Sequence, residues 1–138
     1  MAASQPVGNV LIVEDDVATR EMLVTLLALE GFHAVAVEDG LEALHVLRTI
    51  RHRAPDVPCF ILLDLAMPRM GGPEFRRAQL SDPAVATVPM AIISGAADEA
   101  QVLSQPLGAV ATLAKPLDVS KVIEVVRGHC RRPATATD

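Results

Sequence analysis

Apolar residues gather in five short runs along the chain, and each gap between two runs is long enough for one helix and two turns. The runs are VLIV at 10–13, AVAV at 34–37, CFILL at 59–63, MAII at 90–93 and AVATL at 109–113. Because apolar residues fall on both faces of each run, the pattern is typical of parallel strands that helices cover on both sides. It predicts five buried parallel strands.

The segments between the runs repeat their apolar residues with the period of a helix. We predict helices over 17–30, 40–50, 71–80 and 98–104, and a fifth helix that begins after Asp118 as its N-cap. The residues expected to face the core are Met22, Leu23, Leu26 and Leu27 in the first helix, Ala43, Leu44, Leu47 and Ile50 in the second, and Val119, Val122, Ile123 and Val126 in the fifth. Strand and helix therefore alternate five times.

This alternation predicts an open parallel sheet with helices on both faces, because crossover connections are right-handed. Ligands of such sheets bind outside the carboxyl ends of the strands, where strand order reverses. The polar or special residues at those ends are Glu14, Asp15 and Asp16 after the first run, Asp64 after the third, Ser94 and Gly95 after the fourth, and Lys115 and Pro116 after the fifth. Nothing comparable is expected after the second run.

Three of these residues are carboxylates that would converge if the first and third strands are neighbours. Glu14, Asp15 and Asp64 would then repel one another unless a cation or a proton is taken up. Oxygen-only ligation with few protein groups suits Mg²⁺. Adding Lys115 and Ser94 completes a site complementary to a phosphoryl group, with Asp64 as the nucleophile that would form an acyl phosphate.

The motifs VLIVEDD, DLAMPRMGG, ISGAA and LAKP, in this order and spacing, resemble the receiver domain of bacterial two-component response regulators. The resemblance covers about residues 8–130. It implies a flavodoxin-like (βα)5 α/β fold whose five parallel strands have the order 2-1-3-4-5. We expect one receiver domain at 9–131, an N-terminal extension at 1–8, and a C-terminal tail or linker start at 132–138.

By resemblance, Asp64 is the phosphoacceptor and Asp15 a direct Mg²⁺ ligand, and Asp64 is expected to reach the same ion. Glu14 would hold metal-bound water, and the backbone carbonyl of Ala66 would complete the protein ligands of the ion. Asp16 is expected to be a solvated residue at a helix start. Met67, Pro68 and Met70 are expected to pack the loop rather than to take part in chemistry.

The resemblance further implies that Ser94 is the switch hydroxyl, that Lys115 binds the phosphoryl group, and that the peptide bond from Lys115 to Pro116 is cis. One residue departs from the family pattern. Thr112 stands three residues before the lysine, where the family usually has Tyr or Phe. The usual aromatic rotamer switch is therefore absent, and the signalling mechanism must differ.

The expected function is that of a phosphoacceptor regulator rather than an enzyme. A sensor histidine kinase or a phosphotransfer protein would supply the phosphoryl group, and a downstream protein would bind the face formed by the fourth helix, fifth strand and fifth helix. Three alternatives are a receiver that docks unphosphorylated, a Mg²⁺-dependent aspartyl phosphohydrolase of the haloacid dehalogenase type, and a flavodoxin. Ala66 stands where the phosphohydrolase needs a second Asp, and the acidic EDD loop would repel a flavin phosphate. The segment RRPATATD is too short for an output domain, which leaves a single-domain regulator or part of a longer protein.

Charge and the length of the apolar stretches argue against nucleic acid and membranes as binding partners. The formal net charge of −5, with scattered basic residues, argues against direct nucleic-acid binding. The longest apolar stretch, Met22–Leu29, is too short to cross a bilayer, and the first residues, MAASQPVGN, lack the features of a signal peptide. We therefore expect a cytoplasmic protein that does not bind membranes.

The cysteines and histidines show no metal-binding spacing. Cys59 and Cys130 lie far apart without a CxxC motif, and we expect two unpaired reduced thiols. His33, His45, His52 and His129 are dispersed along the chain and are expected to be surface or packing residues.

Overall fold

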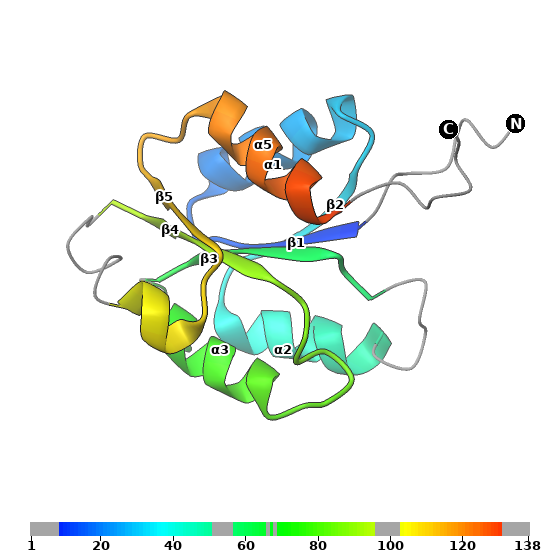
Figure 1. Cartoon of the computed structure of the whole chain (residues 1–138), viewed down its shortest axis with the longest axis vertical. Coiled ribbons are helices and arrows are strands. Elements are labelled where there is room, and N and C mark those ends of the chain that lie inside the picture. Colours follow the sequence, from blue (N-terminus) through cyan, green and yellow to red (C-terminus); the bar gives the residue numbers. More distant parts are fainter. Residues whose placement is uncertain (1–8, 51–56, 66, 68, 96–102, 131–138) are drawn as a thin grey trace, which may run out of the picture.

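A five-stranded parallel sheet lies between two helical layers in the computed structural model, which describes residues 9–50, 57–65, 67, 69–95 and 103–130. The strands are β1 (Asn9–Val13), β2 (His33–Val37), β3 (Phe60–Asp64), β4 (Met90–Ser94) and β5 (Ala111–Ala114). Their order is β2-β1-β3-β4-β5, so the predicted α/β fold class and strand order are confirmed. Helices α1 (Val17–Leu29) and α5 (Val119–His129) cover one face, and α2 (Gly40–Ile50) and α3 (Gly72–Leu80) cover the other (Figure 1).

Burial of the strands follows their place in the sheet. The central strands β3 and β4 are buried throughout, and β1 is buried from Val10 onward. The prediction of burial on both faces is wrong for β2 and β5, where Val35 is 38% exposed and Thr112 is exposed. These two strands form the sheet edges, and the flanking helices cover them only in part.

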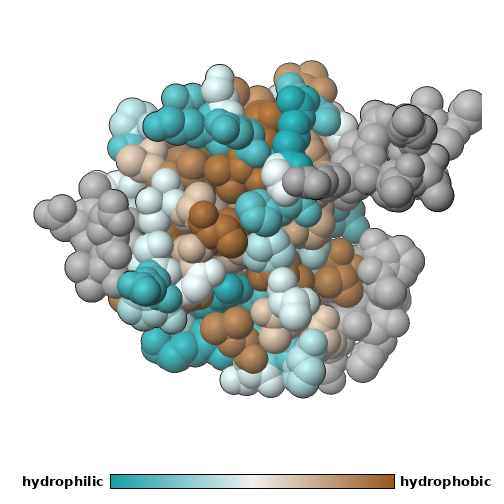
Figure 2. Space-filling view, in the orientation of Figure 1, coloured by the Kyte–Doolittle hydropathy of each residue, from teal (hydrophilic) through white to brown (hydrophobic). Residues whose placement is uncertain are grey.

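The core consists of two apolar clusters, one on each face of the sheet, because successive strand residues point to opposite sides. Ile12 and Leu62 pack with α1 and α5, whereas Leu11 and Ile61 pack with α2 and α3. Figure 2 shows hydrophilic residues spread over the helices on the viewed face, with hydrophobic ones gathered between them.

Most of the predicted inward-facing helix residues are buried. Leu23 and Leu27 of α1 are fully buried, as are Val122 and Val126 of α5. The prediction is wrong for Met22, which is 39% exposed. The contact of α1 with the sheet is narrow, and the buried residues of the helix are Leu23 and Leu27. The prediction is also wrong for Val119, 45% exposed, which lies at the start of α5 before the helix reaches the core. The side chain of Ile50 lies outside the described residues.

Side-chain caps open two of the helices. Asp16 accepts hydrogen bonds from the N–H of Thr19 at 2.9 Å and from its hydroxyl at 2.6 Å, and these bonds lower the pKa of the Asp16 carboxyl. Asp118 accepts a hydrogen bond from the N–H of Ser120 at 2.9 Å. Both residues were predicted at helix starts, and both cap there.

The fourth predicted helix, 98–104, lies partly outside the described residues. Residues 103–107 are helical, so the helix extends beyond the predicted end. It closes at Gly108, whose φ of 69° suits glycine, with the N–H of Ala109 donating to the Ser104 carbonyl at 2.9 Å. No helix within the described residues is long and apolar enough to cross a membrane.

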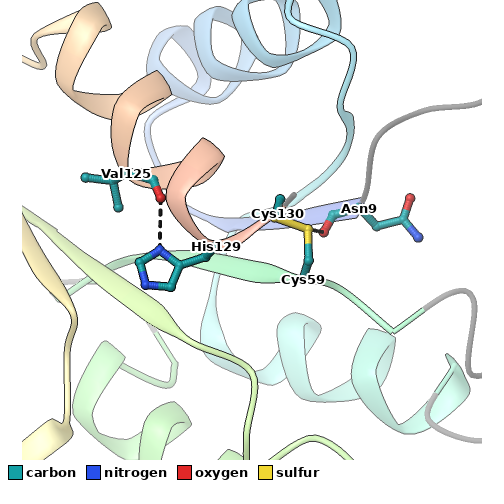
Figure 3. Close-up of a disulfide and its surroundings, with 5 residues drawn as sticks. All are labelled: Asn9, Cys59, Val125, His129 and Cys130. Carbon is teal, nitrogen blue, oxygen red and sulfur yellow. Dashed lines mark hydrogen bonds between the residues drawn. A yellow bond between two sulfur atoms is a disulfide. The ribbon is translucent and has the colours of Figure 1, made fainter. Parts of the chain in front are cut away.

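A disulfide joins Cys59 to Cys130, so the prediction of two unpaired thiols is wrong (Figure 3). The two residues are 71 positions apart in sequence and their Cα atoms are 5.4 Å apart. Cys59 directly precedes β3 and Cys130 caps the C-terminus of α5. Only the return of α5 across the sheet brings them together, and no local spacing signals such a pairing.

Candidate functional site

The carboxyl ends of the four strands β1, β3, β4 and β5 meet at one edge of the sheet. The register pairs Val13 with Leu63, and it pairs Ser94 with Ala114. The residues that follow or end these strands are therefore neighbours. They are Glu14, Asp15, Asp64, Ser94 and Lys115, the residues predicted from the sequence.

Three carboxylates form the centre of this edge. Oxygen atoms of Glu14, Asp15 and Asp64 all lie within 4.8 Å of one another. Glu14 is fully buried and Asp64 is 5% exposed, whereas Asp15 is exposed. The pKa of Asp64 is raised to about 7, chiefly by burial and also by the negative charge of Glu14, while the positive charge of Lys115 opposes both effects.

Lys115 supplies the positive charge that reaches these carboxylates. Its Nζ lies 3.0 Å from Glu14 Oε1 as an ion pair, donates a hydrogen bond to Glu14 Oε2 at 3.2 Å, and lies 3.8 Å from Asp64 Oδ2. Burial lowers the pKa of Lys115, but the hydrogen bond to Glu14 and the charge of Asp64 outweigh burial and leave the pKa raised. The peptide bond between Lys115 and Pro116 is cis, as the resemblance led us to expect.

Backbone and helix contacts fix the acidic loop after β1. The N–H of Glu14 donates to the Val37 carbonyl at 3.0 Å, and the N–H of Asp16 donates to Glu14 Oε2 at 3.0 Å. The Arg20 guanidinium donates to the carbonyls of Glu14 at 2.9 Å and Asp15 at 3.2 Å. These contacts therefore fix the positions of the buried Glu14 and the exposed Asp15, even though the two carboxylates repel each other.

A hard divalent cation fits this donor set. One ammonium faces three carboxylates, which leaves excess negative charge, and Mg²⁺ prefers carboxylate oxygens with several waters retained. Ala66, whose carbonyl was predicted to complete the ligands, lies outside the described residues, as does Pro68.

Glycine is required where α3 begins beside Asp64. A Cβ at Gly72 would lie 2.7 Å from the Asp64 carbonyl oxygen, so only glycine permits this approach. Met67 and Met70 pack against the core, in agreement with the predicted packing role. At Gly95 a Cβ would meet nothing within 4 Å, so packing within the protein does not require glycine there.

The remaining predicted residues lie at different distances from the carboxylates. Ser94 is 5% exposed at the end of β4, and its carbonyl accepts a hydrogen bond from the Lys115 N–H at 2.9 Å. Thr112 pairs with Ile92 in the sheet and is exposed on the edge strand β5. His129 packs against the Phe60 ring at 5.1 Å between centroids, and His33 and His45 are exposed, in agreement with surface or packing roles. His52 lies outside the described residues.

The sequence analysis missed a clamp beside the site, formed by Asp39 after β2 and Arg69 in the loop after β3. Arg69 Nε donates to Asp39 Oδ2 at 2.7 Å, and the guanidinium also pairs with Glu38 at 3.5 Å. The N–H of Gly40 donates to the Met70 carbonyl at 3.0 Å. Arg69 has a φ of 64°, a left-handed conformation that costs a non-glycine residue energy. The clamp therefore holds the loop that follows Asp64.

Asp39 is fully buried, and its Oδ1 also accepts a hydrogen bond from the Glu42 N–H at 3.0 Å. Burial raises the pKa of Asp39, but the hydrogen bonds from Glu42 and Arg69 outweigh burial and leave the pKa lowered. The sequence analysis did not single out Asp39, although an Asp directly before a predicted helix could have indicated an N-cap. Nothing in the sequence pointed to Arg69 as its partner.

A model of the response regulator receiver domain matches residues 10–127. The chain belongs to the response regulator receiver domain family. Receiver domains are phosphoryl-accepting switches of two-component signalling, and response regulators work with histidine kinases and downstream targets. The family prediction made from the motifs is therefore confirmed.

Several known proteins are similar to this receiver domain. It is 32% identical over 125 residues to the DNA-binding response regulator MtrA of Mycobacterium tuberculosis, covering 90% of this chain and 51% of MtrA. It is 31% identical over 132 residues to the transcriptional regulatory protein CpxR homolog of Haemophilus influenzae, covering 95% of this chain and 54% of that protein. The chain thus spans about half the length of the curated relatives it matches.

Solved structures share the fold of this receiver domain. The chemotaxis response regulator CheY4 of Vibrio cholerae superposes with a TM-score of 0.76 at 25% identity, covering 87% of this chain and 96% of that one. The phosphorylated cyanobacterial phytochrome response regulator RcpA superposes with a TM-score of 0.71 at 28% identity, covering 88% and 89%.

Proposed function

We propose that this receiver domain is a cytoplasmic signalling switch that accepts a phosphoryl group on Asp64 in a Mg²⁺-dependent reaction. The observation that carries the proposal is a buried strand-end carboxylate with a pKa raised to about 7, facing Lys115 Nζ at 3.8 Å beside Glu14 and Asp15. When this carboxylate is phosphorylated, its negative charge moves onto the phosphoryl oxygens. Lys115 and a cation can bind those oxygens and so stabilise the charge.

The residues divide the work of the transfer. An Asp64 oxygen forms a bond to phosphorus while the bond from phosphorus to the donor breaks, and the donor keeps the electron pair. Lys115 binds the phosphoryl oxygens and the Ser94 hydroxyl donates a hydrogen bond to them. Asp15, Asp64 and the Ala66 carbonyl would hold the ion, and Glu14 would hold metal-bound water. When bound, Mg²⁺ neutralises charge on the carboxylates and on the transferred group.

The phosphoryl donor is a sensor histidine kinase or a phosphotransfer protein. The output is a changed surface on helix 103–107, β5 and α5, which a downstream protein binds. A groove on that surface is lined by Thr112, Lys121, Glu124, Val125 and His129, among others. MtrA is named as DNA-binding, but the net charge of −5 supports protein contacts rather than nucleic acid for this chain.

The switch starts at Ser94, whose hydroxyl is drawn towards the new phosphoryl oxygens. Because Thr112 cannot fill the vacated space as an aromatic ring would, the change reaches the surface through the position of helix 103–107 and the edge strand β5. The sequence does not support an aspartyl phosphohydrolase activity, because Ala66 stands where that chemistry needs a second Asp.

Intact-mass spectrometry after incubation with acetyl phosphate and Mg²⁺ tests the proposal. We expect the mass of one phosphoryl group to be added, to disappear when Mg²⁺ is chelated, and to be absent in Asp64→Asn. Glu74→Gln, which removes an exposed carboxylate on α3, is the matched control and should label as the wild type does. Full labelling of Asp64→Asn would assign the reaction to another residue.

A further inference from the structure

The disulfide lies at the end of the sheet opposite the acidic site. Cys59 stands before β3 begins, whereas Asp64 stands where β3 ends. Figure 3 shows the bond reaching from the start of β3 to the last turn of α5, beside the carbonyl of Asn9. The cysteine pair is therefore chemically separate from the proposed phosphorylation site.

Both oxidation states of this pair are accommodated by their surroundings. Cys59 Sγ lies 3.2 Å from the Asn9 carbonyl oxygen, which already accepts a hydrogen bond from the Cys59 N–H at 2.8 Å. The sulfur can donate a second one only as a thiol, that is, in the reduced form. Cys130 is 3% exposed within the apolar cluster that includes Val126, where a free cysteine packs as a small hydrophobic residue. Breaking the bond thus leaves no buried polar group without a partner.

Helix α5 is also held without the bond. Asp118 caps its first turn, Val122 and Val126 are fully buried, and Arg127 pairs with Glu30 at the C-terminal cap of α1. The bond attaches at Cys130, the residue after the last turn, whose N–H donates to the Val126 carbonyl at 2.8 Å. Opening the bond would therefore loosen the last turn of α5 and leave the rest of the helix in place.

We propose that Cys59 and Cys130 form a reversible redox modification site whose oxidation clamps the last turn of α5 to the start of β3. In cells, disulfides of this kind are mostly transient and redox-sensing when they occur in reducing compartments. The last turn contributes Gly128 and His129 to the groove between β5 and α5. The oxidation state therefore sets how firmly one wall of that groove is held.

The exchange partner is a low-molecular-weight disulfide such as glutathione disulfide. Cys59 is half-buried and Cys130 is buried, so Cys59 reacts first. Its thiolate attacks one glutathione sulfur, forming a mixed disulfide and releasing one glutathione thiolate. The Cys130 thiolate then attacks the Cys59 sulfur and releases the second. Two protein thiols lose two electrons and their two protons, and one glutathione disulfide becomes two glutathione thiols; excess glutathione reverses the sequence.

Redox titration of the intact chain tests reversibility. The protein is equilibrated in glutathione buffers of increasing oxidised fraction, quenched with an alkylating agent, and weighed by mass spectrometry. We expect one transition from doubly alkylated to unalkylated protein, reached from either direction. Protein that stays reduced in the most oxidising buffer, or a bond that excess glutathione cannot open in the native state, would overturn the proposal.

Single substitutions test the order of the two steps. Cys130→Ser should accumulate one glutathionyl group on Cys59, because the second thiol is missing. Cys59→Ser should stay mostly unmodified, because Cys130 is buried. Equal modification of both variants would contradict Cys59 as the entry point.

Hydrogen exchange tests, independently of any phosphorylation, whether the disulfide holds the last turn of α5. On reduction we expect several-fold faster exchange at residues 126–130, with α2 unchanged. The double variant Cys59→Ser/Cys130→Ser should exchange like the reduced protein in every buffer. Identical exchange of α5 in the oxidised and reduced wild type would show that the bond holds nothing.

Discussion

Asp64 is the one residue of β3 that carries a charge, because the other four residues of the strand are apolar. The sequence sufficed to predict its position beside Glu14, Asp15 and Lys115, since the ends of parallel strands meet and these residues also stand at such ends. The clamp of Asp39 and Arg69 could not be predicted in the same way. Its two residues lie in loops 30 positions apart, and neither loop carries a pattern that names the other.

Asp15→Asn removes one charge from three mutually repelling carboxylates. We expect the metal-free variant to melt at a higher temperature than the wild type, and its Mg²⁺ affinity to fall about tenfold or more. Thermal melts at increasing Mg²⁺ concentration measure both effects. Glu21→Gln, an exposed acid of α1, is the control. A variant that kept the wild-type rise in melting temperature with Mg²⁺ would show that Asp15 is not a ligand.

Arg69→Ala leaves the buried Asp39 carboxylate without its guanidinium. We expect a loss of about 1–3 kcal/mol in the free energy of unfolding at pH 7, measured by urea denaturation. The pKa of Asp39 is lowered in the folded state, so its charged form stabilises the fold above the ordinary value of 3.8, and this contribution is lost as pH falls through the folded pKa. The gap between wild type and variant should therefore shrink below pH 3.8.

Lys121→Ala, which removes an exposed cation of α5, is the control for that experiment and should change stability little at either pH. A gap between wild type and Arg69→Ala that stayed constant through acidic pH would mean that Asp39 is not what the guanidinium stabilises.

At the scale of the elements, α3 and helix 103–107 are joined by a buried arginine. Arg76, 5% exposed, donates from Nε to the Leu107 carbonyl at 2.9 Å and from Nη1 to the Val88 carbonyl at 3.2 Å. It also donates to Gln79 Oε1 at 2.6 Å and to the Gly108 carbonyl at 3.4 Å. Burial lowers the pKa of Arg76. This cation thus holds the end of helix 103–107 against α3.

Arg76→Ala would remove the guanidinium donor from the carbonyls of Leu107 and Gly108, whereas the Val88 carbonyl keeps Gln79 Nε2 as a donor at 3.2 Å. We expect it to lower the free energy of unfolding by about 1–3 kcal/mol and to shift the amide resonances of Leu107 and Gly108. Arg77→Ala is a matched control, because the neighbouring arginine of the same helix is exposed and should cost no more than about 0.5 kcal/mol. Equal losses in the two variants would remove the distinction between the buried and the exposed arginine.

The elements also show where sequence patterns stop being informative. Apolar runs located all five strands, because continuous apolar stretches and the gaps between them depend on local spacing. They could not distinguish the edge strands β2 and β5 from the centre, since neighbours in the sheet decide burial. Met22 was misplaced because the period of a helix fixes a face but not how wide the contact with the sheet will be. Val119 was misplaced because the period does not show where along its length the helix meets the core.

At the scale of the whole molecule, the sheet carries chemistry at both ends. The carboxyl ends of the strands hold the acids and Lys115, and the opposite end holds the cysteine pair. The strand order followed from the family resemblance, and with it the convergence of Glu14 and Asp64. The pairing of Cys59 with Cys130 is a product of that same topology, yet two cysteines alone carry no sequence signal for it.

A phosphoryl mimic should reveal how far the site acts across the molecule. With beryllofluoride and Mg²⁺ bound, we expect the largest amide shift changes at Asp64 and Ser94 and through helix 103–107 into β5, because Thr112 offers no aromatic ring to spread the change. Helix α2 should change little. Large shifts over α1 and α2, with Ser94 and helix 103–107 silent, would refute this route.

The account depends most on Asp64 as the residue that becomes phosphorylated. Borohydride reduction of an acyl phosphate converts the aspartate to homoserine, which peptide sequencing by mass spectrometry locates directly. After treatment with acetyl phosphate and Mg²⁺, we predict homoserine at position 64 alone, and none when Mg²⁺ is chelated. Homoserine at position 15 or 16, or its absence from phosphorylated protein, would contradict the account.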